Sequence, residues 1–85
     1  MQVLIRRAAA KMLRRIPADR RTQILQRLKD LAADPNSRAL DVQPLAGGES
    51  FRLRVGDYRI IFSLDRPAGV LTVDAIRTRG DVYKR

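Results

Sequence analysis

Apolar and charged residues alternate along residues 51–62, the segment FRLRVGDYRIIF. This alternation predicts two β-strands, and the Gly-Asp pair in the middle predicts a two-residue turn between them. In the resulting hairpin Val55 lies opposite Tyr58, and the next pair outward is Arg54 with Arg59. One face is then apolar and aromatic, with Phe51, Leu53, Val55, Tyr58, Ile60 and Phe62. The other face carries Arg52, Arg54 and Arg59, with Ile61 and Ser63 beside them.

The predicted pairing sets two cations directly across from each other. Arg54 and Arg59 occupy opposing positions in the hairpin, and like charges in such positions destabilise a sheet. An anion bound between the two guanidinium groups would remove this repulsion. The pattern therefore favours a polyanionic ligand on the charged face of the hairpin.

The first part of the chain predicts one strand and two helices. Residues 1–6 (MQVLIR) predict a short strand, and residues 8–15 have apolar side chains at helical spacing. Pro17 ends this helix and suits the first turn of the next, which stops at residues 34–36 (DPN). The second helix has a long core-facing stripe of Ile24, Leu25, Leu28, Leu31 and Ala32. Off that stripe lie Arg20, Arg21, Arg27 and Lys29, which predict a solvated face.

The remaining segments complete an α+β arrangement. A loop is expected up to Ser50, then the hairpin, and then a strand over residues 70–76 (VLTVDAI) in an antiparallel sheet. Both the odd-numbered and the even-numbered residues of this last strand include apolar side chains, so the pattern does not decide on which face of the sheet Arg77 lies. The order β-α-α-β-β-β places both helices on one face of a single sheet. The arginine face of the hairpin is then the uncovered face.

Charge and composition support an anionic partner. Lysine and arginine number 18 against 9 aspartate and glutamate residues, which gives a formal net charge of +9. Such an excess predicts binding to nucleic acid or to an acidic protein segment. Fifteen of the cations are arginines, whose planar fork suits phosphate oxygens, although a GC-rich genome would enrich arginine as well.

The absence of certain residue types excludes several chemistries. The chain has no cysteine and no histidine, which excludes thiol catalysis, disulfides, ordinary zinc sites and histidine acid/base chemistry. We therefore expect no metal and no cofactor. No apolar run approaches the roughly 18 residues of a membrane span, and the N-terminus lacks the apolar core of a signal peptide. A cytoplasmic protein without membrane contact is expected.

Four segments, taken in order, carry a family resemblance: IPADRRTQIL, LAGG, FRLRVGDYR and RGDVY. Each is a weak signal alone, but together they resemble the RelE/ParE toxin superfamily of bacterial type II toxin–antitoxin systems, and specifically its RelE-like branch. The resemblance covers nearly the whole chain. It implies a single RelE-like toxin domain over residues 1–85.

The resemblance implies a ribosome-dependent mRNA endonuclease that inhibits translation. In the RelE-like branch the toxin enters the ribosomal A site, and the 2′-hydroxyl of the mRNA attacks the adjacent phosphate. The implied partners are mRNA on the ribosome and a cognate acidic antitoxin. The protein must supply cations for the scissile phosphate, a proton-transfer group and a platform on which a base stacks.

By motif, the resemblance assigns catalytic positions to Arg52, Arg54, Arg59, Arg77 and Tyr83. RNA contacts are assigned to the same arginines together with Arg79, Lys84 and Arg85. The family often has lysine at the position of Arg52 or Arg54, and a lysine could act as general base. Arginine stays protonated, so the proton acceptor stays open among the Tyr83 hydroxyl, a ribosomal RNA group and water.

Other functions remain compatible with the sequence. One is a ParE-like inhibitor of DNA gyrase that acts through protein contacts, and another is a catalytically weak RNA-binding relic of the toxin family. The strand arginines could also be a merely solvated face, and the ring of Tyr83 could only pack on the sheet. The basic hairpin face and the late Arg-Arg-Tyr cluster favour the nuclease.

Overall fold

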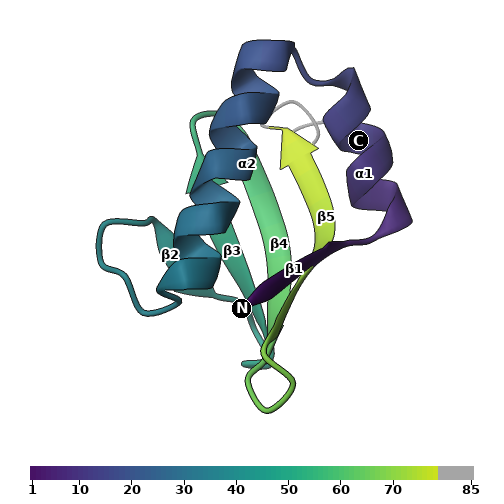
Figure 1. Cartoon of the computed structure of the whole chain (residues 1–85). Coiled ribbons are helices and arrows are strands. Elements are labelled where there is room, and N and C mark those ends of the chain that lie inside the picture. Colours follow the sequence, from purple (N-terminus) through teal and green to yellow (C-terminus); the bar gives the residue numbers. More distant parts are fainter. Residues whose placement is uncertain (79–85) are drawn as a thin grey trace.

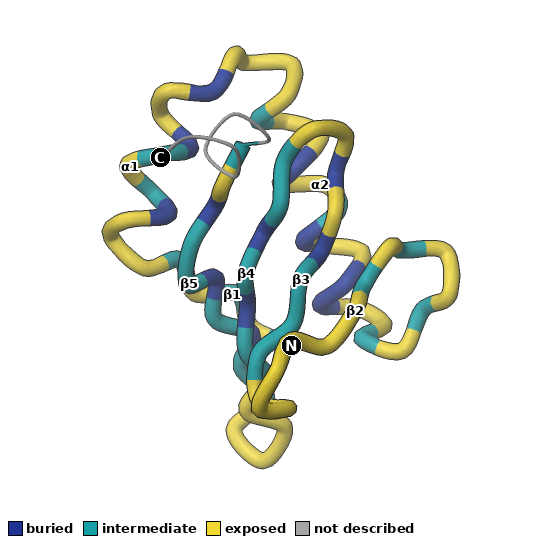
Figure 2. Tube along the Cα trace, turned by 180° about the vertical axis from the view of Figure 1, so that it is seen from behind, coloured by how far each residue is buried: buried dark blue, intermediate teal, exposed yellow. Residues whose placement is uncertain are grey.

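A computed structural model describes residues 1–78, so the predictions for Arg79, Tyr83, Lys84 and Arg85 lie outside the described residues. Its elements are β1 (Gln2–Ile5), α1 (Arg7–Arg15), α2 (Ala18–Ala33), β2 (Val42–Pro44), β3 (Ser50–Val55), β4 (Tyr58–Asp65) and β5 (Val70–Thr78). The strands form one sheet of order β1-β5-β4-β3-β2. Both helices cover one face of it (Figure 1), and the opposite face is open when seen from behind (Figure 2). The predicted α+β class and helical layer are confirmed.

Two features of the sheet correct the sequence prediction. Residues 42–44, expected within a loop, form β2, which pairs antiparallel with β3. A three-residue strand that contains a proline gives little sequence signal, and Pro44 is tolerated because β2 lies at the sheet edge. In addition, β1 pairs with β5 in parallel, so the sheet is mixed rather than antiparallel. The two helices provide the long connection that parallel pairing requires.

The central hairpin has the predicted register. Val55 pairs with Tyr58, and Arg54 pairs with Arg59. Gly56 has a φ of +58°, and no non-glycine residue among those described has a positive φ. A positive φ at the first central position only is the type II′ pattern, which favours glycine there and matches the twist of paired strands. The turn thus fixes which side chains of β3 and β4 share a face.

A bulge in β5 determines the face on which Arg77 lies. The register of β4 with β5 shifts between Ile61 and Phe62, so Asp74 is an extra residue in β5. Before the bulge the odd-numbered residues of β5 face the helices, whereas after it the buried residue is Ile76. Arg77 therefore lies on the open face, which resolves the alternative that the alternation pattern left open.

The core lies between the helices and the sheet, and each large side chain in it contributes about 1.5–3 kcal/mol by leaving water. Its members are Ala9, Leu13, Ile16, Ile24, Leu28, Leu31, Ala32, Leu53, Val55, Ile60, Phe62, Leu71, Val73 and Ile76. The predicted stripe of α2 is confirmed except at Leu25, which is 37% exposed. Leu25 instead lines a shallow groove with Val3 and Ile5, between α2 and β1.

Arg21 ties the two helices together at their junction. Its Nε donates to the carbonyl of Leu13 at 3.0 Å, and a terminal nitrogen donates to the carbonyl of Ile16 at 2.9 Å. Carbonyls at the end of an α-helix have no partner within the helix, and a cation there also complements the helix dipole. Arg21 is therefore half-buried and structural, which corrects its assignment to a solvated face.

We expect Arg21→Ala to lower the free energy of unfolding by about 1–3 kcal/mol, because two charge-assisted hydrogen bonds to the end of α1 are lost. Urea denaturation followed by circular dichroism measures the change. Arg20→Ala is the matched control, since Arg20 is exposed and pairs only with Asp19 at 3.8 Å. Equal effects of the two substitutions would show that the contacts of Arg21 do not stabilise the helix junction.

Candidate functional site

Three arginines line up across neighbouring strands of the open face. Arg54 of β3 pairs with Arg59 of β4, and Arg59 pairs in turn with Arg77 of β5. Directly opposed residues of antiparallel strands lie about 4.5–5.5 Å apart, so the three side chains leave the sheet within about 10 Å of one another. We call Arg54, Arg59 and Arg77 the arginine row.

The arginine row has no internal neutralisation. Arg54 and Arg77 are exposed and Arg59 is half-buried. Within residues 1–78, the ion pairs involve other side chains and none of these three. Each directly opposed pair of like charges costs up to about 1 kcal/mol. A row of this kind, without an ion-pair partner among residues 1–78, is a suitable binding site for an anion such as a phosphate group.

Arg52 lies on the same face but in a different environment. Its terminal nitrogen is 3.6 Å from a carboxylate oxygen of Asp41, and its side chain is only 16% exposed, against 53% for Asp41. The Asp41 carbonyl also accepts a hydrogen bond from the Arg54 amide at 2.9 Å. Sequence analysis missed Asp41 because the segment that precedes β2 reads as a loop, and no other signal places it beside β3. Arg52 is thus restrained at the edge of the arginine row.

The rest of the open face is less charged. Ile61 and Ser63 follow Arg59 along β4 and lie opposite Ala75 and Thr72 of β5. Leu4 of the neighbouring β1 is 47% exposed. The cations of the open face therefore concentrate at the end of the sheet near the Gly56 turn, whereas Asp65 is the charged side chain that β4 carries at the other end.

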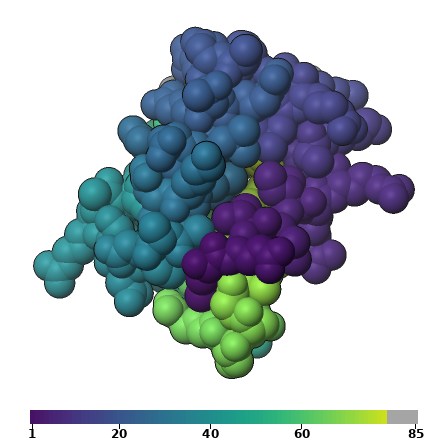
Figure 3. All heavy atoms as spheres, in the orientation of Figure 1, coloured from purple at the N-terminus to yellow at the C-terminus, as the bar shows by residue number. Residues whose placement is uncertain are grey.

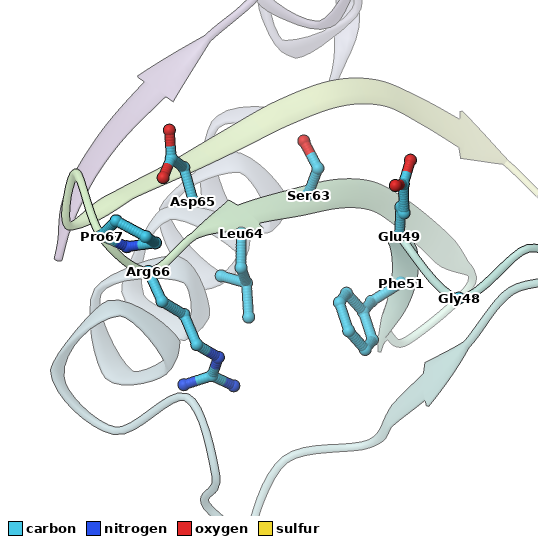
Figure 4. A pocket seen from close by; sticks show the side chains of 8 residues that line it. All are labelled: Gly48, Glu49, Phe51, Ser63, Leu64, Asp65, Arg66 and Pro67. Carbon is cyan, nitrogen blue, oxygen red and sulfur yellow. The ribbon is translucent and has the colours of Figure 1, made fainter.

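An open hollow of about 610 Å³ lies at the opposite end of β3 and β4 from the Gly56 turn. In Figure 4, Phe51, Leu64 and Arg66 point to one side of the strands, whereas Ser63 and Asp65 point to the other. Glu49 and Asp65 offset the charge of Arg66, so this hollow lacks the concentrated positive charge of the arginine row. Phe51 also stacks on Phe62, with ring centroids 5.5 Å apart, which is a core contact.

The described part of the chain offers few groups for other chemistry. In residues 1–78, no cluster of three or more histidine, cysteine, aspartate or glutamate side chains has the arrangement of a metal site. No helix in the same residues combines the length and apolar character needed to cross a membrane. Tyr58 is half-buried and packs against the core, so its ring does not belong to the open face. Hydrogen bonding and positive charge are what the arginine row supplies.

A family model described as the ParE toxin of the type II toxin–antitoxin system, parDE, matches residues 3–83. The chain therefore belongs to this toxin family, within the RelE/ParE superfamily that its motifs indicated. It is a toxin of a type II toxin–antitoxin system. No curated protein matches the sequence.

Solved structures of RelE toxins share the fold. The archaeal RelE–RelB complex from Pyrococcus horikoshii OT3 matches with a TM-score of 0.81 and 29% identity, over 93% of this chain and 94% of the other. Isolated RelE from E. coli matches with a TM-score of 0.75 and 18% identity, over 91% of this chain and 82% of the other. The toxin–antitoxin complex RelBE2 from Mycobacterium tuberculosis matches with a TM-score of 0.75 and 19% identity, over 92% of this chain and 96% of the other. The last two comparisons support the fold alone.

We expect Asp41→Asn to strengthen polyanion binding, because it removes a negative charge from the open face and frees Arg52 for a phosphate contact. With a single-stranded RNA oligonucleotide as the probe, the slope of log affinity against log salt should steepen by about 0.7, the value for one added phosphate. Asp30→Asn is the matched control, since Asp30 lies on α2 and pairs with Arg27 at 3.8 Å. The same change in both variants would mean that net charge alone is responsible.

Proposed function

We propose that this toxin is a ribosome-dependent mRNA endonuclease that inhibits translation. The observation that carries the proposal is the arginine row, three opposed cations on an open sheet face without an ion-pair partner among residues 1–78. The archaeal RelE structure supports a RelE-like reading by its fold and its 29% identity. Arg52 would extend the phosphate-binding surface at the edge of the row, restrained by Asp41.

The proposed reaction needs no redox step and no cofactor. The 2′-oxygen of a nucleotide forms a bond to the adjacent phosphorus, and the bond from phosphorus to the 5′-oxygen breaks. One proton leaves the 2′-hydroxyl and another reaches the 5′-oxygen, which yields a cyclic phosphate and a 5′-hydroxyl. Negative charge grows on the phosphoryl oxygens during the attack, and the guanidinium groups of Arg54, Arg59 and Arg77 would stabilise it by hydrogen bonding.

Proton transfer requires a group other than these arginines, because arginine remains protonated at physiological pH. The family resemblance assigns this role or base stacking to Tyr83, and we propose that Tyr83 either stacks on a base or exchanges a proton. Arg79, Lys84 and Arg85 would hold the flanking backbone. The ribosome would hold the mRNA in line for attack, and such orientation contributes much of the rate in reactions of this kind.

A second candidate function is inhibition of DNA gyrase, which the name of the matching family model favours. Protein interfaces depend on a few buried anchors, most often Trp, Tyr and Arg, surrounded by packed contacts. The end of the open face near the Gly56 turn presents arginines without an aromatic side chain among residues 1–78, which suits a chain of phosphates or an acidic segment better than a packed protein surface. We therefore rank gyrase inhibition second, and RNA binding without cleavage third.

We also propose that an acidic antitoxin segment neutralises the toxin by covering the arginine row. The RelE structures from Pyrococcus horikoshii and Mycobacterium tuberculosis are complexes with an antitoxin, and the chain has a formal net charge of +9. Charge pairing of this kind is screened by salt. A disordered acidic segment that folds on contact would match an open and charged sheet face.

The affinity of the cognate antitoxin should fall by about tenfold or more between roughly 0.05 M and 0.5 M salt, because exposed charge pairs are screened. Isothermal titration calorimetry over this range measures the change. Arg54→Ala in the toxin should flatten the salt dependence, whereas Arg38→Ala in an exposed loop should leave it unchanged. An affinity that does not respond to ionic strength would exclude charge pairing as the main contact.

Arg54→Ala and Arg59→Ala should each reduce single-turnover cleavage of ribosome-bound mRNA by about a hundredfold or more, the scale for one lost preorganised donor. Lysine at either position should restore only part of the rate, since a point charge replaces a fork. Primer extension on stalled ribosomes measures the rate. Arg38→Ala removes an exposed arginine outside the row and should cleave at the parental rate.

Three outcomes would contradict the proposal. Parental rates in folded Arg54→Ala and Arg59→Ala would show that the arginine row is not the active site. Efficient cleavage of a short free oligonucleotide would exclude dependence on the ribosome. Gyrase-dependent DNA breaks without mRNA cleavage would establish the second candidate function instead.

A further inference from the structure

The outward surface of α1 carries a second group of cations, apart from the arginine row. We call it the α1 cluster, and its four exposed members are Arg7, Lys11, Arg14 and Arg15. With a rotation of about 100° per residue, the four side chains fall within an arc of about 100°. The buried Ala9 and Leu13 lie on the opposite side of the helix. Figure 3 shows α1 forming part of the molecular surface.

Arg14 and Arg15 lie in the last turn of α1 and complement the helix dipole, whereas the other interactions of the α1 cluster work against the stability of the helix. The first turn of α1 contains no acidic residue, and Arg7 there opposes the positive end of the helix dipole. Arg7 with Lys11, and Lys11 with Arg15, are like-charge pairs four residues apart, which destabilise a helix. None of the four has an ion-pair partner among residues 1–78, whereas Arg20 and Arg27 on α2 each pair with an aspartate. An external anion would offset this repulsion.

The composition of the arc indicates what kind of anion fits. It contains no apolar or aromatic side chain, although the centre of a protein interface usually combines such residues with arginine. Contacts to a phosphate backbone need only exposed cations. Along the helix axis Lys11 lies about 6 Å from Arg7, and Arg14 lies about 4.5 Å further on. Such spacing suits a series of phosphates better than one isolated anion.

We propose that the α1 cluster binds the phosphate backbone of a nucleic-acid duplex, namely structured RNA beside the strand held on the arginine row. α1 packs against β5, the strand that carries Arg77, and the two run side by side in Figure 1. The choice of RNA as the nucleic acid rests on the proposed function. The α1 cluster supplies affinity, however, and takes no part in the cleavage chemistry.

The test compares two full-length variants with the same change in net charge. The first is R7Q/K11Q/R14Q/R15Q in the α1 cluster, and the control is R20Q/R27Q/K29Q/R38Q elsewhere on the surface. The probe is an RNA hairpin with a duplex of about 16 base pairs, enough for two successive minor grooves. The cluster variant should lose affinity tenfold or more, with a salt slope shallower by about 3.6, or about 0.9 for each of four phosphate contacts. Equal losses in the two variants would overturn the proposal.

A second measurement separates the α1 cluster from the proposed cleavage site. At saturating ribosome concentration the cluster variant should cleave mRNA at the parental rate, while half-maximal cleavage should need tenfold or more ribosomes. A lower rate at saturation would overturn the assignment to affinity alone. If the protein cleaves no mRNA at all, the proposed function fails, yet loss of hairpin binding by the cluster variant alone would still support the α1 cluster.

Folding and ligand controls complete the experiment. Glutamine is a good helix former, and removal of the like-charge repulsion offsets the loss of Arg14 and Arg15 from the last turn, so the cluster variant should melt close to the parent. If it does melt lower, R7Q/K11Q replaces it, with half the change in slope expected. Tighter binding of a DNA duplex than of the RNA hairpin would overturn the RNA assignment. Loss of binding to poly-glutamate, with hairpin binding unchanged, would assign the cluster to an acidic protein instead.

Discussion

The bulge at Asp74 is the local feature on which the candidate site and part of the fold depend. It shifts the alternation of β5 by one residue, so that Ile76 enters the core while Arg77 faces outward beside Arg59. The carboxylate of Asp74 also accepts a hydrogen bond from the Arg6 Nε at 2.9 Å, directly before α1 begins. One extra residue therefore completes the arginine row and anchors the start of a helix. Bulges next to functional sites commonly re-aim a side chain in this way.

Stability and charge oppose each other in this small protein. A chain of 85 residues buries little more apolar surface than it needs to fold, and its net charge adds repulsion within the folded state. The contacts of Arg21 show how some of the positive charge contributes to structure, because this guanidinium closes the end of α1. The arginine row and the α1 cluster have no such role. A ligand that neutralises either surface would stabilise the folded state by mass action.

Local patterns predicted the hairpin well. The alternation of residues 51–62 and the turn at Gly56 determine the pairing of Arg54 with Arg59, because both depend on neighbours in the chain. β2 and the contact of Asp41 with Arg52 depend on segments brought together by the fold, and they leave no periodic signal. Arg21 shows the same limit, since its partners are carbonyl groups at the end of another helix. The assignment of site roles rests on the family resemblance, because exposed arginines alone do not specify a reaction.

The parallel pairing of β1 with β5 joins Gln2 to Val70, near the two ends of the described chain. Contacts between residues so distant in sequence are slow to form, and chains fold from the N-terminus as they are synthesised. A nascent chain that has emerged as far as β4 contains Arg54 and Arg59 but lacks both Arg77 and the partner strand of β1. β1 can pair only after β5 has emerged, so the complete arginine row assembles after the helices and the central hairpin have been synthesised. The topology thus delays the finished site until β5 has left the ribosome that made it.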